Sequence, residues 1–308
     1  MVVTTKNHGS VEEARVHLDA NHLEAAELAM SEAATLDQED MAIVGERDLP
    51  IGTPDEAQPF RLTIVVPIYN EVKTAVQVVT HLLELTLPTP IEVLVVDDGS
   101  SDGTTEALES LKHPHLRVMG HKENCGKGKA VLTALRHVTG SHVLVFDGDS
   151  EYDPGDIPRV IQPLLTGRAE VVYGSRMSGF GTVHPTFTHL VGNRLMTFAA
   201  NVLFGAALSD LHTCIKILPV PLLHALDLTE SRFALDTEIS AELLRLGFRP
   251  YEIPISYVGR SKEEGKKIKF ADAFRCVYVL LKIRFRPRTR YGNRDRSLAP
   301  PVYVPRSA

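Results

Sequence analysis

The sequence predicts an α/β protein built on a doubly wound, mostly parallel sheet, and two observations carry this prediction. Five short runs are nearly continuous in Val, Ile and Leu, as expected for parallel strands buried on both faces. The segments between them have helical patterns, so strand and helix alternate as in repeated βα units. With 308 residues, 44% of them hydrophobic, the chain can bury one large core.

Each element follows from its local pattern. The predicted strands are RLTIVVP (61–67), IEVLVVD (91–97), LRVMG (116–120), SHVLVFD (141–147) and EVVYG (170–174). The predicted helices lie between them, at roughly 72–85, 104–111, 127–138 and 156–166. In such a sheet, ligands bind beyond the carboxyl ends of the strands, so we expect the chemistry in the loops that follow the strands.

Charge divides the chain into three parts. Residues 1–60 hold 13 acidic and 3 basic side chains, so residues 1–58 are interpreted as an acidic extension, disordered or loosely helical. Residues 59–285 form the predicted catalytic domain. Residues 286–308 form a basic, Pro-containing tail that continues the basic run starting at Lys282, for which a solvated surface and contact with anionic lipid are equally compatible interpretations.

Cysteine spacing and hydropathy predict a cytoplasmic protein. Cys125, Cys214 and Cys276 stand far apart, which favours reduced thiols over disulfides or a zinc site. The first residues lack the basic and apolar regions of a secretory signal, and no apolar run reaches the roughly 18 residues of a membrane span. We therefore expect a soluble protein, or one bound peripherally to the inner face of a membrane, and no nucleic-acid partner.

Carboxylates follow three of the predicted strands. Pro67-Ile68-Tyr69-Asn70-Glu71 comes after the first strand, Asp98 after the second, and Asp147-Gly148-Asp149-Ser150-Glu151 after the fourth. Asp147 and Asp149 could share one Mg²⁺ or Mn²⁺, which prefers oxygen ligands and can bridge a diphosphate. A single D-x-D is more often an ordinary Asp-Gly turn, and Asp98 could equally cap a helix or bind a base or ribose.

Basic residues lie in loops or at helix starts between the middle of the chain and its end. They are Lys127 and Lys129 before a predicted helix, then Arg176, Arg194, Arg260, Lys266 and Lys267. A single arginine is usually a surface residue, but several of them beside acidic strand ends predict a metal-bridged diphosphate and a second anion.

Taken together, these motifs resemble glycosyltransferase family 2, in its dolichol-phosphate or polyprenyl-phosphate mannosyltransferase-like branch. The matching segments are VVPIYNE, VVDDGSSDGT, NCGKGKA, FDGDSEYDP and VVYGSR, followed by SDLHTCIK, DTEISAELLRLGF and YEIPISYVGRSKEEGKKIKFAD. The resemblance covers roughly residues 61–285 in the family's order. It implies a GT-A fold and transfer of a sugar from a nucleotide-diphosphate sugar to a polyprenyl phosphate.

The resemblance also implies roles for matching positions. Pro67, Tyr69 and Glu71 would lie against the nucleotide, with Asp98 beside its base or ribose and Lys129 nearby. Asp147 and Asp149 would form the metal-binding pair, with Glu151 also facing the metal. Four basic residues would bind the donor diphosphate or the acceptor phosphate: Arg176, Arg194, Arg260 and Lys266.

The family mechanism would be a single displacement with inversion at the anomeric carbon. Negative charge develops on the leaving diphosphate, where a cation and arginines stabilise it most. A phosphate acceptor is already a nucleophile and needs only positioning, whereas a hydroxyl acceptor needs a general base. Asp236 and Glu238 are the candidate bases, although both could equally compensate the start of a helix.

Alternatives remain at this point. A hydroxyl acceptor such as a polysaccharide or small polyol is the main one; a nucleotidyltransferase would need a Gly-rich first loop where this chain has PIYNE. A non-enzymatic scaffold is disfavoured by the full set of acidic and arginine positions. The stretches 195–208 and 273–283 could offer an apolar surface to a lipid, although such stripes belong to the core more often.

Overall fold

The computed structural model describes residues 41–43, 60–177, 181–184, 186–260 and 270–286. Its strands are β1 (Met41–Ile43), β2 (Leu62–Ile68), β3 (Ile91–Asp97), β4 (Leu116–His121), β5 (His142–Val145), β6 (Val172–Ser175), β7 (Thr182–Val183), β8 (Lys216–Pro219), β9 (Tyr251–Pro254) and β10 (Tyr257–Val258). Its helices are α2 (Ala75–Leu83), α3 (Thr104–Glu109), α4 (Lys127–Leu135), a 3₁₀ turn (Pro154–Asp156), α5 (Ile157–Leu165), α6 (Phe187–Phe204), α7 (Val220–Ala225), α8 (Leu235–Arg245) and α9 (Phe270–Phe285).

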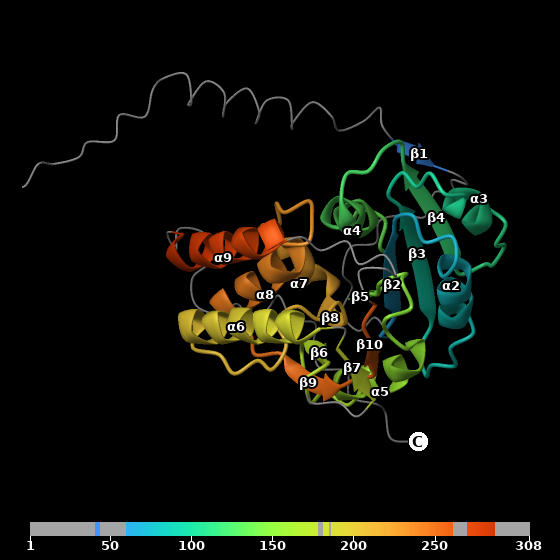
Figure 1. Cartoon of the computed structure of the whole chain (residues 1–308). Helices are drawn as coiled ribbons and strands as arrows, with labels where there is room; N and C mark the ends of the chain where they lie inside the picture. Colours follow the sequence, from blue (N-terminus) through green and yellow to red (C-terminus); the bar gives the residue numbers. More distant parts are fainter. Residues whose placement is uncertain (1–40, 44–59, 178–180, 185, 261–269, 287–308) are drawn as a thin grey trace, which may run out of the picture. The chain divides into compact units, whose positions relative to one another are not determined.

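One mixed, mostly parallel sheet organises these elements (Figure 1). The strand order is β1-β4-β3-β2-β5-β8-β6-β9, and β4, β3, β2 and β5 run parallel to one another. β8 is antiparallel to both its neighbours, β5 and β6, while β9 is parallel to β6. The α/β class and all five predicted strands are confirmed, with the observed ends shifted by a few residues at most.

Alternation along the strands builds a core on each face of the sheet. In β2, Val65 packs into a core that includes residues of α4, α7, α8 and α9, whereas Ile64 and Val66 pack into a second core with α2 and α5. Successive side chains of a strand point to opposite faces, so a strand covered on both sides must be apolar throughout. The helices therefore lie on both faces, as the doubly wound prediction requires.

The strand order reverses beside β2. From β2 the chain moves to β3 and β4 on one side, and then returns to place β5 on the other side of β2. A crevice at the carboxyl ends of the strands is expected at such a switch point, because the loops there leave in opposite directions. The loops after β2 and β5 are the two that carry Glu71 and Asp149.

The sheet extends beyond the predicted strands. β8 and β9 were not predicted as strands, and β1 lies within the segment interpreted as an extension, where Met41–Ile43 pairs antiparallel with β4. The rest of the extension lies outside the described residues, as does the tail beyond Arg286, so both boundaries stay predictions. No helix among the described residues is both long enough and apolar enough to cross a bilayer.

Candidate active site

The loops after β2, β3 and β5 are held together by hydrogen bonds. Asn70 N donates to Ser100 Oγ (2.8 Å), and Thr74 Oγ1 donates to the carbonyl of Gly148 (3.0 Å). Two residues in these loops, Asn70 (φ 51°) and Ser150 (φ 60°), adopt left-handed backbone conformations that are uncommon outside glycine. Such strain persists where the surrounding contacts demand it and is frequent at functional sites.

Arg260 binds acidic side chains from two of these loops. Its Nη1 and Nη2 donate to the two carboxylate oxygens of Glu71 (2.8 and 3.0 Å), and Nη2 also donates to Asp149 Oδ2 (3.1 Å). Its backbone N–H donates to Glu151 Oε1 (2.8 Å). A bidentate guanidinium–carboxylate pair has a defined geometry, so Arg260 fixes the two loops relative to each other.

The charge balance around Asp149 is unfavourable to its ionised form. Burial, with the nearby Asp147 and Glu151 carboxylates, raises the pKa of Asp149 to about 7, although Arg260 opposes the shift. Glu151 itself accepts a hydrogen bond from the Tyr257 hydroxyl (2.8 Å). Three carboxylates thus lie within electrostatic reach of one another at the end of β5.

Lys127 neutralises the other half of the cluster. Its Nζ lies 2.8 Å from Asp147 Oδ1 and 3.1 Å from Asp236 Oδ2, and Lys216 Nζ lies 3.1 Å from Asp236 Oδ1. Burial alone would lower the pKa of Lys127, but Asp147 and Asp236 raise it well above its ordinary value. The sequence analysis placed Lys129 near the nucleotide. Both lysines belong to the same GKGK motif, and only the fold shows that Lys127 is the one that faces Asp147.

Asp236 is a carboxylate paired with two lysines. Burial favours its neutral form, but Lys127 and Lys216 hold its pKa well below its usual range. A carboxylate with a depressed pKa is a weak base. Glu238, the other candidate base, accepts three 2.8 Å hydrogen bonds, from the Thr229 N–H and hydroxyl and from the Glu230 N–H, and therefore fixes the turn before α8.

Arg176 is committed to a buried partner. Its Nε and Nη2 donate to the two oxygens of Asp210 (2.7 and 2.8 Å), and its guanidinium carbon lies 5.0 Å from the centre of the Tyr257 ring. Burial opposes ionisation of Asp210, but Arg176 and Asn193 hold its pKa well below the usual range. Arg176 therefore packs against the Tyr257 ring and helps to fix its position, and the Tyr257 hydroxyl in turn donates a hydrogen bond to Glu151.

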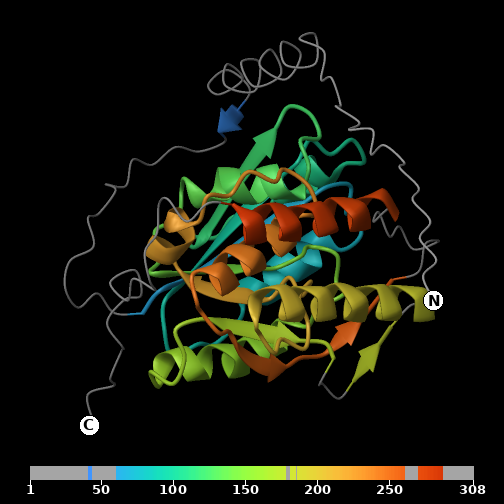
Figure 2. The same ribbon diagram turned by 90° about the vertical axis from the view of Figure 1, so that its left-hand side faces the viewer.

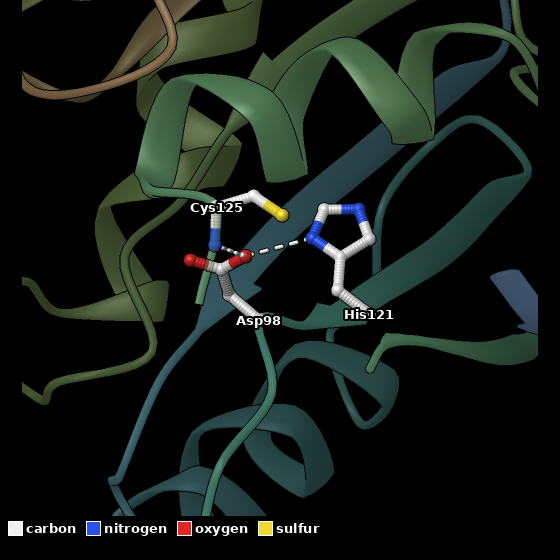
Figure 3. Close-up of side chains that lie close together, drawn as sticks. All are labelled: Asp98, His121 and Cys125. Atoms are coloured by element: carbon white, nitrogen blue, oxygen red, sulfur yellow. Dashed lines mark hydrogen bonds and ion pairs between the residues drawn. The ribbon is translucent and has the colours of Figure 1, made fainter. Parts of the chain in front are cut away.

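Asp98 anchors the loop that leads into α4 (Figure 3). Its Oδ1 lies 2.7 Å from His121 Nδ1 and accepts from the Cys125 N–H (3.0 Å), while Oδ2 accepts from the Gly126 N–H (2.7 Å). His121 Nε2 lies 2.9 Å from Thr133 Oγ1. The predicted contact of Asp98 with a base or ribose stays a prediction. Its alternative role was to cap the helix starting near Thr104, whereas these hydrogen bonds go to Cys125 and Gly126 before α4.

Two groups of side chains are candidates for a metal. Donor atoms of Asp98, His121 and Cys125 lie within 4.8 Å of one another, but thiol and imidazole ligands suit metals other than Mg²⁺, and Asp98 already accepts backbone hydrogen bonds. Asp147, Asp149 and Glu151 offer only oxygens, which Mg²⁺ and Mn²⁺ prefer. Their mutual repulsion at the end of β5 fits a divalent cation there, although Asp147 and Asp149 now turn toward different protein cations.

The remaining predicted residues occupy different surroundings. Pro67 lies within β2, Tyr69 directly follows that strand, and Lys129 lies in the first turn of α4, where its N–H donates to the Ser231 carbonyl (2.9 Å). Arg194 is exposed on α6. Lys266 and Lys267 lie outside the described residues.

Comparison with known proteins identifies the family. The model of the family described as "Glycosyl transferase family 2" matches residues 63–226, which is more than half of the chain. Glycosyltransferase AglJ of Haloferax volcanii is 29% identical over 203 residues, covering 66% of this chain and 64% of AglJ. The low-salt glycan biosynthesis hexosyltransferase Agl6 of the same organism is 28% identical over 61% of this chain, but only 45% of its own length is matched.

A third relative is matched over almost its whole length. The UDP-N-acetylglucosamine–dolichyl-phosphate N-acetylglucosaminyltransferase of Methanococcus voltae is 26% identical over 243 residues, 72% of this chain and 95% of the relative. Among solved structures, glucosyl-3-phosphoglycerate synthase of Mycobacterium tuberculosis in complex with UDP superposes with a TM-score of 0.58 and 19% identity, covering 75% of this chain and 82% of that one.

The same synthase has also been solved with Mn²⁺, UDP and glucosyl-3-phosphoglycerate. At this identity the likeness establishes the fold, which confirms the GT-A architecture implied by the sequence motifs. The order of the strands, the acidic loops at the switch point and the match of the family model lead to one conclusion. The chain belongs to glycosyltransferase family 2.

Proposed function

We propose that the protein is an inverting, metal-dependent hexosyltransferase that moves a sugar, mannose or glucose, from a nucleotide-diphosphate donor to a polyprenyl phosphate of the dolichyl type. The observation that carries this proposal is the position of Asp236 between Lys127 and Lys216. An acceptor hydroxyl would need a base, and this carboxylate is a poor one. A phosphate monoester is an anionic nucleophile at neutral pH and needs only to be positioned.

The acidic residues at the end of β5 suit the donor side of this reaction. Asp147 and Asp149, with Glu151 beside them, would hold Mg²⁺ or Mn²⁺. When bound, the cation supplies positive charge to the diphosphate as its bond to the anomeric carbon breaks. Pro67, Tyr69 and Glu71, at or after the end of β2, and Asp98, after β3, would lie against the nucleotide at the switch point.

Basic side chains of the site would bind the phosphate groups of the donor and the acceptor. Lys127 pairs with Asp147 and Arg260 pairs with Asp149, so both basic side chains would lie beside a donor phosphate if these carboxylates held a divalent cation. Arg176 holds Asp210 and positions Tyr257 rather than offering its whole guanidinium to a ligand. The relative whose name includes dolichyl phosphate supports the choice of acceptor.

The test is transfer of radiolabel from a panel of UDP- and GDP-sugars, with Mg²⁺ or Mn²⁺, to a polyprenyl phosphate dissolved in detergent. We expect label from one donor to enter the organic phase, and we expect EDTA or Asp147→Asn to abolish this transfer. Slow, metal-dependent hydrolysis of a donor with no lipid product would contradict the proposal that the acceptor is a polyprenyl phosphate. It would still support the proposed donor site. The hydroxyl-acceptor alternative would then gain support if small polyols became labelled.

A further inference from the structure

Asp98, His121 and Cys125 bring three different donor groups together (Figure 3). One carboxylate oxygen of Asp98, one ring nitrogen of His121 and the Cys125 Sγ all lie within 4.8 Å of one another. Asp98 is buried, whereas His121 and Cys125 are partly exposed. The cluster is therefore shielded on its carboxylate side and partly accessible from solvent through the other two residues.

The sheet fixes the first two residues of this cluster. Asp98 directly follows β3, and its N–H donates to the Ile68 carbonyl (2.7 Å). His121 is the last residue of β4, which pairs with β3 on one side. On the other side β4 pairs with β1, where Met41 lies opposite His121, and Figure 2 shows β1 beside the end of β4. The backbone of His121 is thus held by strands on both sides.

The loop between β4 and α4 brings Cys125 to the other two residues. This loop packs closely on Gly99, where the backbone has a positive φ (70°) and a Cβ would lie 2.5 Å from the Glu123 carbonyl carbon. The N–H groups of Cys125 and Gly126 then donate to the two carboxylate oxygens of Asp98 (3.0 and 2.7 Å). The main chain therefore holds Cys125 beside the Asp98 carboxylate without help from a ligand.

His121 is oriented from both of its ring nitrogens. Its Nδ1 lies 2.7 Å from Asp98 Oδ1, and its Nε2 lies 2.9 Å from Thr133 Oγ1 of α4. A proton must lie between Nδ1 and Oδ1, because a ring nitrogen and a carboxylate oxygen are otherwise both acceptors. A cation in the place of this proton would be bound by Nδ1, and Nε2–H would donate to Thr133. Such an outer-shell hydrogen bond is usual for a histidine that binds a metal.

The donor set selects the class of cation. Thiolate and imidazole are ligands of Zn²⁺ and other thiophilic cations, whereas Mg²⁺ and Mn²⁺ prefer oxygen. Three protein ligands leave the fourth position of a tetrahedral Zn²⁺ for water. Three residues separate His121 from Cys125, a spacing common for paired zinc ligands. The sequence analysis disfavoured a zinc site because the cysteines stand far apart, but this site uses only one of them.

We propose that Asp98, His121 and Cys125 bind Zn²⁺ or a similar thiophilic divalent cation, and that this cation inhibits the enzyme. On binding, the neutral imidazole exchanges its Nδ1 proton for one on Nε2, and the Cys125 thiol releases its proton to solvent as the thiolate coordinates the cation. The inhibition rests on the proposed function, because Asp98 is the residue expected beside the base or ribose of the nucleotide. A cation on its carboxylate would replace that contact.

The binding test is titration of the full chain with Co²⁺, a coloured substitute for Zn²⁺. We expect the near-ultraviolet absorption of a thiolate–Co²⁺ bond, which added Zn²⁺ removes. Cys125→Ser should abolish this absorption and weaken Co²⁺ binding by about 100-fold or more, and Thr133→Val should weaken it by about 10-fold. Cys276→Ala is the matched control, because it removes a thiol of α9 outside the cluster and should leave the absorption unchanged.

Thermal unfolding gives a second readout that needs no activity. Zn²⁺ should raise the unfolding temperature of the wild type more than that of Cys125→Ser, because a ligand that binds the native state stabilises it. Absence of the thiolate–Co²⁺ absorption in the wild type, or its persistence in Cys125→Ser, would overturn the metal site.

The inhibition test is competition with nucleotide. UDP or GDP, whichever binds the protein in the presence of Mg²⁺, should weaken Co²⁺ binding about tenfold at a concentration ten times its Kd. Zn²⁺ should inhibit sugar transfer by the wild type more strongly than transfer by Cys125→Ser, each measured against its own activity without Zn²⁺. Co²⁺ binding that is indifferent to bound nucleotide would overturn the inhibitory role.

The two proposals can fail separately. If the thiolate–Co²⁺ absorption depends on Cys125 but no donor sugar is transferred in any assay, the proposed function fails and the metal site stands. If sugar is transferred to lipid but Co²⁺ gives no thiolate absorption, the metal site fails alone.

Discussion

At the scale of single residues, the site is a chain of alternating charges. Lys216, Asp236, Lys127 and Asp147 form one half, and Asp149, Arg260 and Glu71 form the other. Removing one member of a buried ion pair leaves its partner uncompensated, which costs far more than loss of an exposed pair. The two lysines of the GKGK motif can therefore be separated by mutation.

Lys127→Met should lower kcat/KM for donor transfer by about 100-fold, because Asp147 and Asp236 lose their shared cation and their geometry. Lys129→Met, two residues along the same helix, should lower it less, since Lys127 alone lies in the ion-pair chain. Steady-state kinetics of both variants, with circular dichroism to verify folding, is the measurement. Equal losses in the two variants would contradict the assignment of Lys127.

Arg260→Gln tests the other half of the cluster. We expect a fall of about 10- to 1,000-fold in kcat/KM, because Glu71 and Asp149 lose the guanidinium that joins their loops. Arg260→Lys should recover only part of the activity, since an ammonium cannot make the bidentate pair with Glu71. Steady-state kinetics of the two variants is the measurement. Full activity of Arg260→Lys would contradict the role of the bidentate pair with Glu71.

At the scale of elements, the start of α4 packs against the loop before α8. A Cβ at Gly128 would lie 2.3 Å from the Glu230 carbonyl oxygen and 2.6 Å from the Ser231 carbonyl carbon, so only glycine permits this approach. The same loop donates hydrogen bonds to the Glu238 carboxylate, and Glu230 is paired with Arg275 of α9. The position of Lys127 thus depends on contacts from three helices.

Gly128→Ala should lower the free energy of unfolding by about 1–3 kcal/mol, because backbone atoms must move to admit the methyl group. Gly192→Ala is the matched control, since a Cβ there meets nothing within 4 Å in the middle of α6. It should raise the free energy of unfolding by about 0.5–1 kcal/mol through helix propensity. Urea unfolding of both variants measures the difference, and similar values would contradict the packing argument.

At the scale of the whole molecule, buried titratable groups make stability depend on pH. Burial lowers the pKa of His142 to about 4. The unfolded chain, with an ordinary histidine pKa near 6.5, therefore binds more protons than the native state between about pH 4 and 6.5. The stabilising contribution of neutral His142 is complete above pH 6.5 and is lost as the pH falls toward 4.

The free energy of unfolding of the wild type relative to His142→Gln should fall by up to about 3 kcal/mol between pH 7 and pH 4. Using the difference is essential, because the raised pKa of Asp149 acts in the opposite direction and is present in both proteins. Urea titrations at four pH values provide the measurement. A difference that does not change with pH would show that His142 is not buried in its neutral form.

Much of this molecule follows from local patterns. Continuous Val, Ile and Leu runs predicted five strands, because a strand covered on both faces has no polar side to display. The acidic residues after β2, β3 and β5 predicted where the site lies, because parallel strands bring their carboxyl ends to one edge. The antiparallel β8 escaped prediction because it is a short strand, and its pairing depends on residues far away in sequence.

The sequence by itself determined the fold class and the family, and it predicted the edge of the sheet that carries the candidate site. Only the tertiary structure decided which of two lysines faces Asp147 and that Asp236 is held by two cations. It also decided that Glu238 holds a turn and that four large apolar residues of α6 are exposed. The physical reason is the same in each case. Composition and periodicity describe residues that are neighbours along the chain, so they predict local structure. An ion pair or the exposure of a side chain depends on how elements distant along the chain pack together.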